Sequence, residues 1–369
     1  MCSGPCLSFC IILAKVLSGK RLREESVSRR ITGDSVGHTL VYAVNGLWSI
    51  MALAGNAAIP ANLGFEILET LGHGARSTIY LVREKSTASR YALKRVIRNS
   101  SADQRFIEQA ILEHEVAQQF NHPSLRKSHR TFKIKKLFRI KEVYVLMEAV
   151  DGLTLEQRRP TDMLEVCRIF QDTAIALGVM HRAGYVHADI KPNNILVTQQ
   201  DMVKIIDFGQ SCPNNTRKER IQGTPDYIAP EQVKREHITP KTDVFNLAAT
   251  MYFVLTQQHV PTLIPKGGAG MNLVDRGPTK CPSPMELNAK VPPALSGLIM
   301  NCLEQEPRER PESMTRVYER LEMAIGQIKS EQGGGAAKQP NKPVVPEDSI
   351  LPGSALSDTG SLDIDSLFA

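Results

Sequence analysis

Four side chains near the middle of the chain have the types and spacing needed to handle a phosphorylated, metal-bound substrate. Asp189, Lys191 and Asn194 follow one another closely, and Asp207 comes thirteen residues after Asn194. A carboxylate can accept the proton of an attacking hydroxyl, and an ammonium group can neutralise charge on a phosphate. Asn and Asp supply the hard oxygen ligands that magnesium prefers. These residues predict phosphoryl transfer from a triphosphate, with Asp189 and Lys191 catalytic and with Asn194 and Asp207 as magnesium ligands.

A glycine-bearing loop lies upstream, between two segments that alternate as β-strands do. Glycines let backbone N–H groups approach phosphate oxygens, so the loop is a candidate phosphate-binding element. Ser77 stands where a third glycine is typical, and an ordinary hairpin explains the isolated pattern at least as well. The loop gains weight from Lys94, twenty residues after Gly74. Its residues are Leu71-Gly72-His73-Gly74-Ala75-Arg76-Ser77-Thr78-Ile79.

Lys94 needs a partner that fixes its position. It shares a strand face with Ala92, and its compact charge suits the α- and β-phosphates of a nucleotide. Glu113 is the candidate partner, because it lies on the apolar stripe of a predicted helix over 101–120. Glu115 is the alternative, but it lies off that stripe. The stripe consists of Phe106, Ala110, Glu113, Ala117 and Phe120.

The elements that must position these residues predict an α+β fold with two lobes. The first lobe, about 64–148, combines the helix over 101–120 with a small sheet; the second, about 149–328, is mainly helical. We expect strands at 65–71, 79–82, 91–96 and twice within 130–147, a turn at 72–74, and helices at 162–182, 241–256, 293–303 and 312–329.

The bulk properties are those of a soluble globular protein. The chain has 369 residues, of which 42% are apolar and 23% charged. Its net charge of +6 is scattered, so no nucleic-acid partner is expected. Seven cysteines without a C-x-x-C pair argue against a zinc site or a disulfide framework and favour a reducing compartment.

The two ends of the chain read differently from the middle. Residues 1–63 form an N-terminal extension without clear periodicity, and no charged residue occurs from Thr39 to Phe65. We expect a cytoplasmic protein, with membrane association through residues 39–59 as the alternative. A further alternative for this segment is that translation starts at Met51, so that the preceding residues are not part of the natural product. Residues 329–369 are predicted to form a disordered acidic tail.

A later segment, Gly223-Thr224-Pro225-Asp226-Tyr227-Ile228-Ala229-Pro230-Glu231, is followed by Asp243 and Arg310. With the motifs above, it resembles the eukaryotic-type (Hanks-type) serine/threonine protein kinases from about residue 65 to residue 328. The resemblance implies a two-lobed kinase fold, ATP and Mg²⁺ as cofactors, and protein substrates.

The same resemblance implies roles for further residues. Glu231 and Arg310 are expected to form a buried ion pair, and Met147 is expected to be the gatekeeper beside the adenine pocket. The remaining nucleotide-binding residues are expected to be Ala92, the hinge from Glu148 to Val150, and Leu196 as the floor of the pocket.

The chain departs from the family pattern in three places, the third of which covers two positions. Ala188 replaces the arginine that pairs with an activation-loop phosphate, so we expect activity that does not depend on such phosphorylation. The loop still offers Ser211, Thr216 and Thr224 as acceptors. Ser77 is expected to weaken ATP binding modestly, and Asn246 and Ala248 to repack the central helix locally. A pseudokinase scaffold and a small-molecule kinase are the competing hypotheses; the sequence predicts neither a particular substrate nor an oligomeric state.

Overall fold

The computed structural model describes residues 40–44, 47–51, 59–74, 76–261 and 281–333. The chain separates into two compact units, Met1–Leu63 and Gly64–Ala369. The first holds an antiparallel hairpin of β1 (Leu40–Val44) and β2 (Leu47–Met51), and the short 3-10 helix η1 (Ala61–Leu63). Part of the stretch considered as a membrane span is therefore β-structure. Within the described residues, no helix is long and apolar enough to cross a bilayer.

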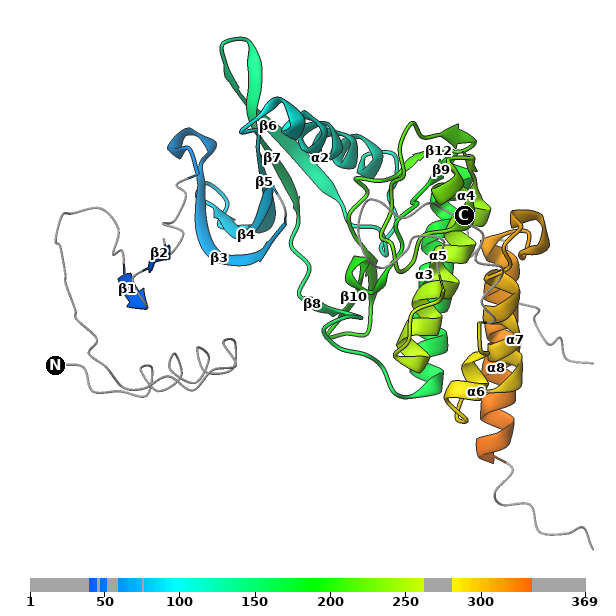
Figure 1. The fold of residues 1–369 in the computed structure, drawn as a ribbon. Helices are drawn as coiled ribbons and strands as arrows, with labels where there is room; N and C mark the ends of the chain where they lie inside the picture. Colours follow the sequence, from blue (N-terminus) through cyan, green and yellow to red (C-terminus); the bar gives the residue numbers. More distant parts are fainter. Residues whose placement is uncertain (1–39, 45–46, 52–58, 75, 262–280, 334–369) are drawn as a thin grey trace, which may run out of the picture. The chain divides into compact units, whose positions relative to one another are not determined.

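The second unit begins with a five-stranded antiparallel sheet in the order β3-β4-β5-β7-β6 (Figure 1). Its first strand continues to His73, which pairs with Thr78, so the predicted turn at 72–74 is wrong. The pairing of β3 with β4 shifts register between Ile67 and Glu69 and again between Thr70 and Gly72. These two irregularities allow β3 to stay paired through His73. The strands are β3 (Phe65–His73), β4 (Ser77–Glu84), β5 (Arg90–Ile97), β6 (Ser128–Lys136) and β7 (Arg139–Glu148).

One helix packs on this sheet. The 3-10 helix η2 (Ser101–Asp103) leads into α2 (Gln104–Ala117), so the helix ends three residues before the predicted Phe120. The predicted stripe is right at its centre, where Ala110 and Glu113 are buried, but Phe106 is only half-buried. Ile107 and Ala110 pack against the inner face of the sheet, at Ala92, Val96, Val143, Val145 and Met147.

The remainder of the unit is mainly helical, and α3, α5, α7 and α8 lie beside one another (Figure 1). Asp162 caps the first of them by accepting a 2.8 Å hydrogen bond from the backbone N–H of Glu165. The last, predicted to end at Lys329, continues to Gly333, and the rest of the predicted tail lies outside the described residues. The helices are α3 (Met163–Arg182), α4 (Pro230–Lys234), α5 (Pro240–Thr256), α6 (Pro284–Leu287), α7 (Pro293–Cys302), α8 (Met314–Gly333), η3 (Pro192–Asn194) and η4 (Pro307–Glu309).

Short strands frame the loops that carry the candidate catalytic residues. The loop with Asp189 runs from β9 to β10, and the segment with Asp207 follows β11 directly. A β-rich small lobe and a larger helical lobe thus confirm the predicted α+β fold. The short strands are β8 (Gly152–Thr154), β9 (Tyr185–Val186), β10 (Ile195–Thr198), β11 (Val203–Ile205), β12 (Cys212–Pro213), β13 (Thr216–Arg217) and β14 (His237–Ile238).

Candidate active site

Lys94 and Glu113 form the ion pair that the sequence predicted. The Nζ atom of Lys94, on β5, lies 2.6 Å from Oε2 of Glu113 on α2. The second carboxylate oxygen of Glu113 accepts a 2.8 Å bond from Nη2 of Arg126, a partner that the sequence did not reveal. Only 1% of the Glu113 side chain is exposed. A buried carboxylate needs compensating charge, and Lys94 and Arg126 supply it.

Asp207 faces the same lysine from the other lobe. Its Oδ1 lies 3.6 Å from Nζ of Lys94, and its backbone adopts a left-handed φ of 66°. The positive charge of Lys94, chiefly, holds the pKa of Asp207 well below its usual range, against the opposing effect of burial. Asp207 is therefore a carboxylate at neutral pH, as a metal ligand must be.

Backbone pairing connects Arg126 to the segment just before Asp207. The backbone N–H of Arg126 donates to the carbonyl of Ile205 at 3.0 Å, and that of Ile205 donates to the carbonyl of Ser124 at 2.7 Å. Arg126 thus holds α2 with its side chain and β11 with its main chain.

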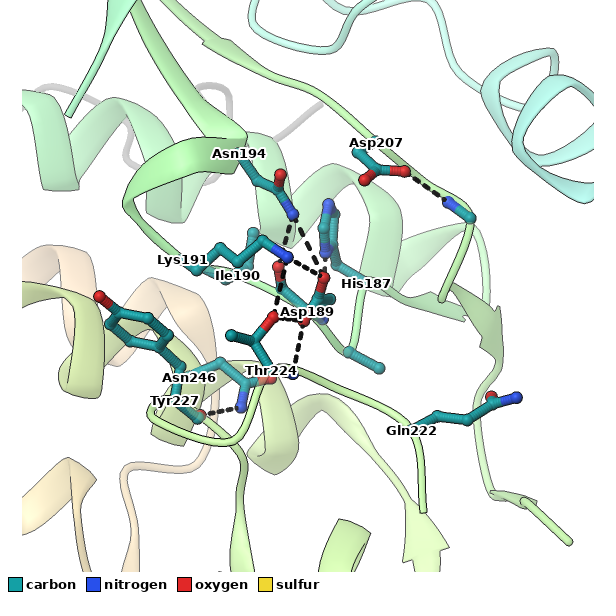
Figure 2. A network of polar contacts seen from close by, with 12 residues as sticks. His187, Asp189, Ile190, Lys191, Asn194, Asp207, Gln222, Thr224, Tyr227 and Asn246 are labelled. Atoms are coloured by element: carbon teal, nitrogen blue, oxygen red, sulfur yellow. Dashed lines mark hydrogen bonds and ion pairs between the residues drawn. The ribbon is translucent and has the colours of Figure 1, made fainter. Parts of the chain in front are cut away.

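A dense polar network surrounds Asp189 (Figure 2). Its Oδ1 accepts hydrogen bonds from both the backbone N–H (2.9 Å) and the hydroxyl (2.8 Å) of Thr224. Its Oδ2 accepts a 2.7 Å bond from Nζ of Lys191, and this ammonium group also donates to the Thr224 hydroxyl at 2.8 Å. The sequence offered Thr224 as a motif residue and as a phosphate acceptor; in the structure it is the contact between the loop that carries Asp189 and the segment ending at Glu231.

Asn194 and Asp207 are the candidate metal ligands, and their free oxygens fit magnesium. The amide nitrogen of Asn194 donates to the carbonyl of Asp189 at 2.8 Å, which leaves the amide oxygen as an acceptor without a hydrogen-bond donor among the described residues. One carboxylate with one amide oxygen is a weak site for an ion bound by protein alone. It suits Mg²⁺, which is commonly held by one or two carboxylates together with substrate phosphates.

The backbone of Ala188 is held in a left-handed conformation, with φ of 61°. Its N–H donates to Oδ1 of Asp243 at 2.8 Å, and its carbonyl accepts a 2.8 Å bond from Nε2 of Gln232. The backbone N–H of His187 donates to the other oxygen of Asp243 at 2.9 Å. Burial acts to raise the pKa of Asp243, but bonds from His181 and His187 outweigh it and lower that pKa. Gln232 on α4 and Asp243 on α5 therefore fix the backbone of the loop that carries Asp189.

An apolar cluster occupies the surroundings of the missing arginine side chain. Ala188 is fully buried with Val186, Cys212 and Ile238. Two short antiparallel ladders, β9 with β12 and β13 with β14, hold the segment after Asp207 against this cluster. The ammonium group of Lys218 also donates to the carbonyl of Gln210 within the segment. Packing around Ala188, the two ladders and the Lys218 contact thus hold this segment in place.

Glu231 and Arg310 form the predicted buried ion pair. Nη1 and Nη2 of Arg310 lie 2.8 and 2.9 Å from the two carboxylate oxygens of Glu231. Asn246, predicted to cause only local repacking, donates a 2.7 Å bond to the carbonyl of Tyr227 (Figure 2). It also donates a 3.1 Å bond to Oε1 of Gln232. It therefore supports the segment between Thr224 and Glu231.

The glycine-bearing loop is closed by its own backbone. The N–H of Gly74 donates to the carbonyl of Ser77 at 2.7 Å, and a Cβ atom on Gly74 would lie 2.6 Å from the Ser77 hydroxyl. Arg76 bonds through Nε to Oδ1 of Asp103 at 2.9 Å, which joins the loop to the start of α2. Ala75 lies outside the described residues.

A cavity of about 400 Å³ joins these groups. Its polar lining includes Arg76, Ser77, Lys94, Asp189, Lys191, Asp207 and Thr224. The predicted adenine-side residues Leu71, Ala92, Glu148, Val150 and Leu196 do not line this cavity.

The adenine-side residues lie on separate strands around the lobe junction. Ala92 pairs with Met147 inside the sheet, and Leu196 is half-buried on β10. The carboxylate of Glu148 forms a 2.8 Å ion pair with Nζ of Lys204, so its side chain connects β7 to β11. The adenine roles of these residues stay predictions.

Comparison with known proteins agrees with this geometry. The protein kinase domain family matches residues 65–320. The chain is 28% identical over 257 residues to the serine/threonine-protein kinase PknB of Mycolicibacterium smegmatis, covering 67% of this chain and 40% of the relative. It is 30% identical over 258 residues to the Aurora kinase of Saccharomyces cerevisiae, covering 67% and 65%. It is 34% identical over 200 residues to the sperm motility kinase 2B of Mus musculus, covering 52% and 39%.

The chain belongs to the protein kinase family, among the Hanks-type serine/threonine kinases. It spans less than two thirds of the length of each of these relatives.

Proposed function

We propose that this chain is an active serine/threonine kinase that transfers the γ-phosphoryl group of ATP to hydroxyl groups of protein substrates. The observation that carries the proposal is the convergence of Lys94, Asp189, Lys191 and Asp207 on one cavity. Two of these residues come from one end of the catalytic loop, one from β5 and one from the segment after β11. Such convergence of phosphate-binding, metal-binding and base groups is what phosphoryl transfer requires.

Lys94 supplies a fixed positive charge for the nucleotide phosphates. Burial acts to lower its pKa, but the carboxylates of Asp207 and Glu113 outweigh burial and raise that pKa. The ammonium group therefore stays charged at every physiological pH. Because Glu113 and Asp207 hold it from two sides, its position costs no reorganisation when phosphate arrives.

Asp189 is the group that orients the attacking hydroxyl and accepts its proton. The Thr224 hydroxyl donates to Oδ1 of Asp189 at 2.8 Å, which supports the proposal that this oxygen can accept a hydrogen bond from a substrate hydroxyl. Lys191 neutralises the neighbouring oxygen and, because it lines the same cavity, is available to the transferred phosphoryl group. Asn194 and Asp207 would hold Mg²⁺, which when bound neutralises charge on the phosphate oxygens.

The segment from Thr224 to Glu231 is the proposed platform for a protein substrate. Thr224 contacts both Asp189 and Lys191, and Glu231 anchors the other end through Arg310. A hydroxyl-bearing peptide lying on this segment is thereby placed close to the base. The contact between Lys191 and Thr224 joins two of the motifs through which the chain resembles serine/threonine kinases, which supports serine and threonine as the acceptor residues.

A phosphotransfer assay tests the proposal. The full chain is incubated with radiolabelled ATP, magnesium and a generic basic protein, followed by phosphoamino-acid analysis. We expect phosphoserine and phosphothreonine, and a loss of roughly 100- to 10,000-fold in Asp189→Asn. Asp201→Asn is the matched control, because Asp201 is an exposed carboxylate. Its backbone is left-handed, a conformation that asparagine also tolerates.

Absence of transfer by the wild type, combined with a thermal shift on adding ATP and magnesium, would replace this proposal with the pseudokinase alternative.

A further inference from the structure

The hairpin that joins β6 to β7 carries an unusual tip. Lys136 pairs with Arg139, so Leu137 and Phe138 form a two-residue turn. Their side chains are 84% and 101% exposed, the highest values for large apolar residues in the described part of the chain. The hairpin projects beyond α2 (Figure 1). Apolar side chains therefore stand at the end of a protruding finger.

The backbone of this turn is costly for its sequence. Leu137 and Phe138 have φ of 49° and 64°, both in the left-handed region. A two-residue hairpin turn with two positive φ values strongly favours Asn-Gly, because bulky side chains are strained there. Leu137 and Phe138 lack the conformational freedom of Asn-Gly in this turn, and their exposed side chains are not stabilised by packing. Strain retained together with exposed apolar surface points to a function outside the folded domain.

Basic residues of one sign surround the tip. Lys133, Lys135, Lys136 and Arg139 are exposed, and none of them forms an ion pair among the described residues. No acidic residue occurs from Arg130 to Lys141. The nearest acid, Glu142, is already held by Arg95 at 2.9 Å. The hairpin end thus combines the apolar tip, Leu137 and Phe138, with a ring of positive charge. We call this ring of Lys133, Lys135, Lys136 and Arg139 the basic collar.

We propose that this hairpin docks the protein on an anionic membrane surface. Leu137 and Phe138 enter the interfacial region, where an aromatic ring is well accommodated, and the collar of Lys133, Lys135, Lys136 and Arg139 contacts the lipid phosphates. A fluid lipid surface takes up a convex finger without a matching groove, whereas a protein partner would need a preformed acidic pocket of that shape. The observations therefore favour lipid.

Docking in this way leaves the catalytic centre accessible. The strand β6 is the edge of the sheet, and no residue of the hairpin lines the cavity that holds Lys94 and Asp207. The inference goes beyond the proposed function and does not depend on it, since a scaffold without activity would dock in the same way.

A vesicle-binding experiment with the full chain tests the proposal. Sedimentation is compared between vesicles of phosphatidylcholine alone and vesicles of phosphatidylcholine mixed with phosphatidylserine. We expect binding to the mixed vesicles only, weakened by salt. The variant Leu137→Asn/Phe138→Gly should bind roughly tenfold more weakly or worse, because it removes the apolar tip. This variant should stay folded, since Asn-Gly suits the turn.

A charge variant and two controls complete the design. Replacing Lys133, Lys135, Lys136 and Arg139 with Gln should weaken binding by roughly two orders of magnitude. Replacing the exposed bases Lys85, Arg90, Lys290 and Lys329 with Gln removes the same charge elsewhere and should have a much smaller effect. Met323→Ser removes a 71% exposed apolar side chain far along the chain and should leave binding unchanged.

A spectroscopic readout shows insertion directly. The chain has one tryptophan, Trp48, so Phe138→Trp adds a second emitter at the tip. A blue shift on adding mixed vesicles, beyond that of the wild type, supports the proposal.

The proposal is overturned if the wild type does not bind mixed vesicles, or if the hairpin variants bind as the wild type does. It is also overturned if the control charge variant loses as much binding as the hairpin variant. Tip-dependent binding to immobilised polyglutamate without vesicle binding would instead assign the hairpin to an acidic protein partner.

Discussion

Two buried ion pairs with the same chemistry are built very differently in the two lobes. Lys94 in the small lobe has a 16% exposed side chain, one 2.6 Å contact with Glu113, and a cavity in front of it. Arg310 in the helical lobe is completely enclosed and bidentate with Glu231. Arg310 also donates to the carbonyls of Lys241, Glu304 and Gln305.

This difference suggests different roles: the Lys94–Glu113 pair is available to a ligand, whereas the Arg310–Glu231 pair stabilises the fold. The guanidinium of Arg310 has its hydrogen-bonding capacity filled from within, so no ligand can use it. The ammonium group of Lys94 faces open space, and Glu113 keeps a second cation, Arg126, if Lys94 is lost. Removing a charge should therefore cost folding in one lobe and catalysis in the other.

The largest effect is expected for Arg310→Met. It leaves Glu231 buried without its cation, which should lower the free energy of unfolding by about 3–5 kcal/mol. For a domain of this size the melting temperature should fall by roughly 10 °C. Arg308→Met, at an exposed site nearby, is the control. A loss below about 1 kcal/mol in urea denaturation would show that the pair does not support the fold.

Lys94→Met should do the reverse. We expect kcat/KM to fall roughly 100- to 1,000-fold, because a preorganised charge beside the α- and β-phosphates of the nucleotide is removed. The free energy of unfolding should change by less than about 1 kcal/mol, since Glu113 stays paired with Arg126. Steady-state kinetics and urea denaturation measure the two quantities, with Lys85→Met as the control. Strong destabilisation by Lys94→Met would remove the contrast between the lobes.

Arg126→Met sharpens the comparison by removing the other partner of Glu113. Stability should fall by about 1–3 kcal/mol, because a buried charge-assisted hydrogen bond is lost. Activity should fall only about tenfold, since Lys94 still holds Glu113 and faces the cavity. The same two measurements apply. Activity as low as that of Lys94→Met would mean that Arg126 is needed to position α2 for catalysis.

Phosphatase treatment of the wild type should change the rate by less than about tenfold. The segment after Asp207 is held by packing around Ala188 and by two short ladders, and no arginine is present at position 188 to receive a phosphate. Rates before and after treatment are compared, with mass spectrometry confirming removal. A larger loss would show that phosphorylation orders the segment by another route.

The smallest effect is a pH dependence at the start of α2. Burial acts to raise the pKa of Asp103, but hydrogen bonds from the backbone of Ser100 and Asn99 and from Arg76 lower it to about 2. Because the unfolded value is near 3.9, Asp103 stabilises the fold above about pH 5, and this contribution is lost as the pH falls towards 2.

Melting temperatures of the wild type and of Asp103→Asn should therefore differ by a constant amount above about pH 5 and converge below it. A constant difference down to acidic pH would contradict this assignment.

Residue spacing and the family resemblance were sufficient to predict the α+β fold and the two buried ion pairs, Lys94 with Glu113 and Glu231 with Arg310. Glu113 was identified because a charged residue on an apolar helical stripe requires a partner, and Glu231 with Arg310 because the family resemblance implied the pair. Arg126, Gln232 and the bonds of Asn246 were not predictable. Arg126 belongs to no motif and has no periodic signal. Its place beside Glu113 depends on the pairing of β11 with the chain at Ser124 and Arg126, which the sequence does not reveal.

The continuation of β3 through Gly72 and His73 was missed for a related reason. Glycine and histidine together indicate a turn when only local propensity is considered. Register shifts in β3 let the strand keep pairing through His73, and such shifts depend on the neighbouring strand. Local sequence thus predicts element types well, while pairing across the sheet decides where they end.

The double attachment of Arg126 has a thermodynamic consequence. Its side chain binds Glu113 on α2, while its backbone pairs with Ile205, two residues before Asp207. The orientation of α2 and the position of the Asp207 carboxylate therefore share a single coupling free energy. By reciprocity, a partner that stabilises this orientation of α2 would strengthen binding of a ligand at Asp207 by the same factor as that ligand strengthens binding of the partner.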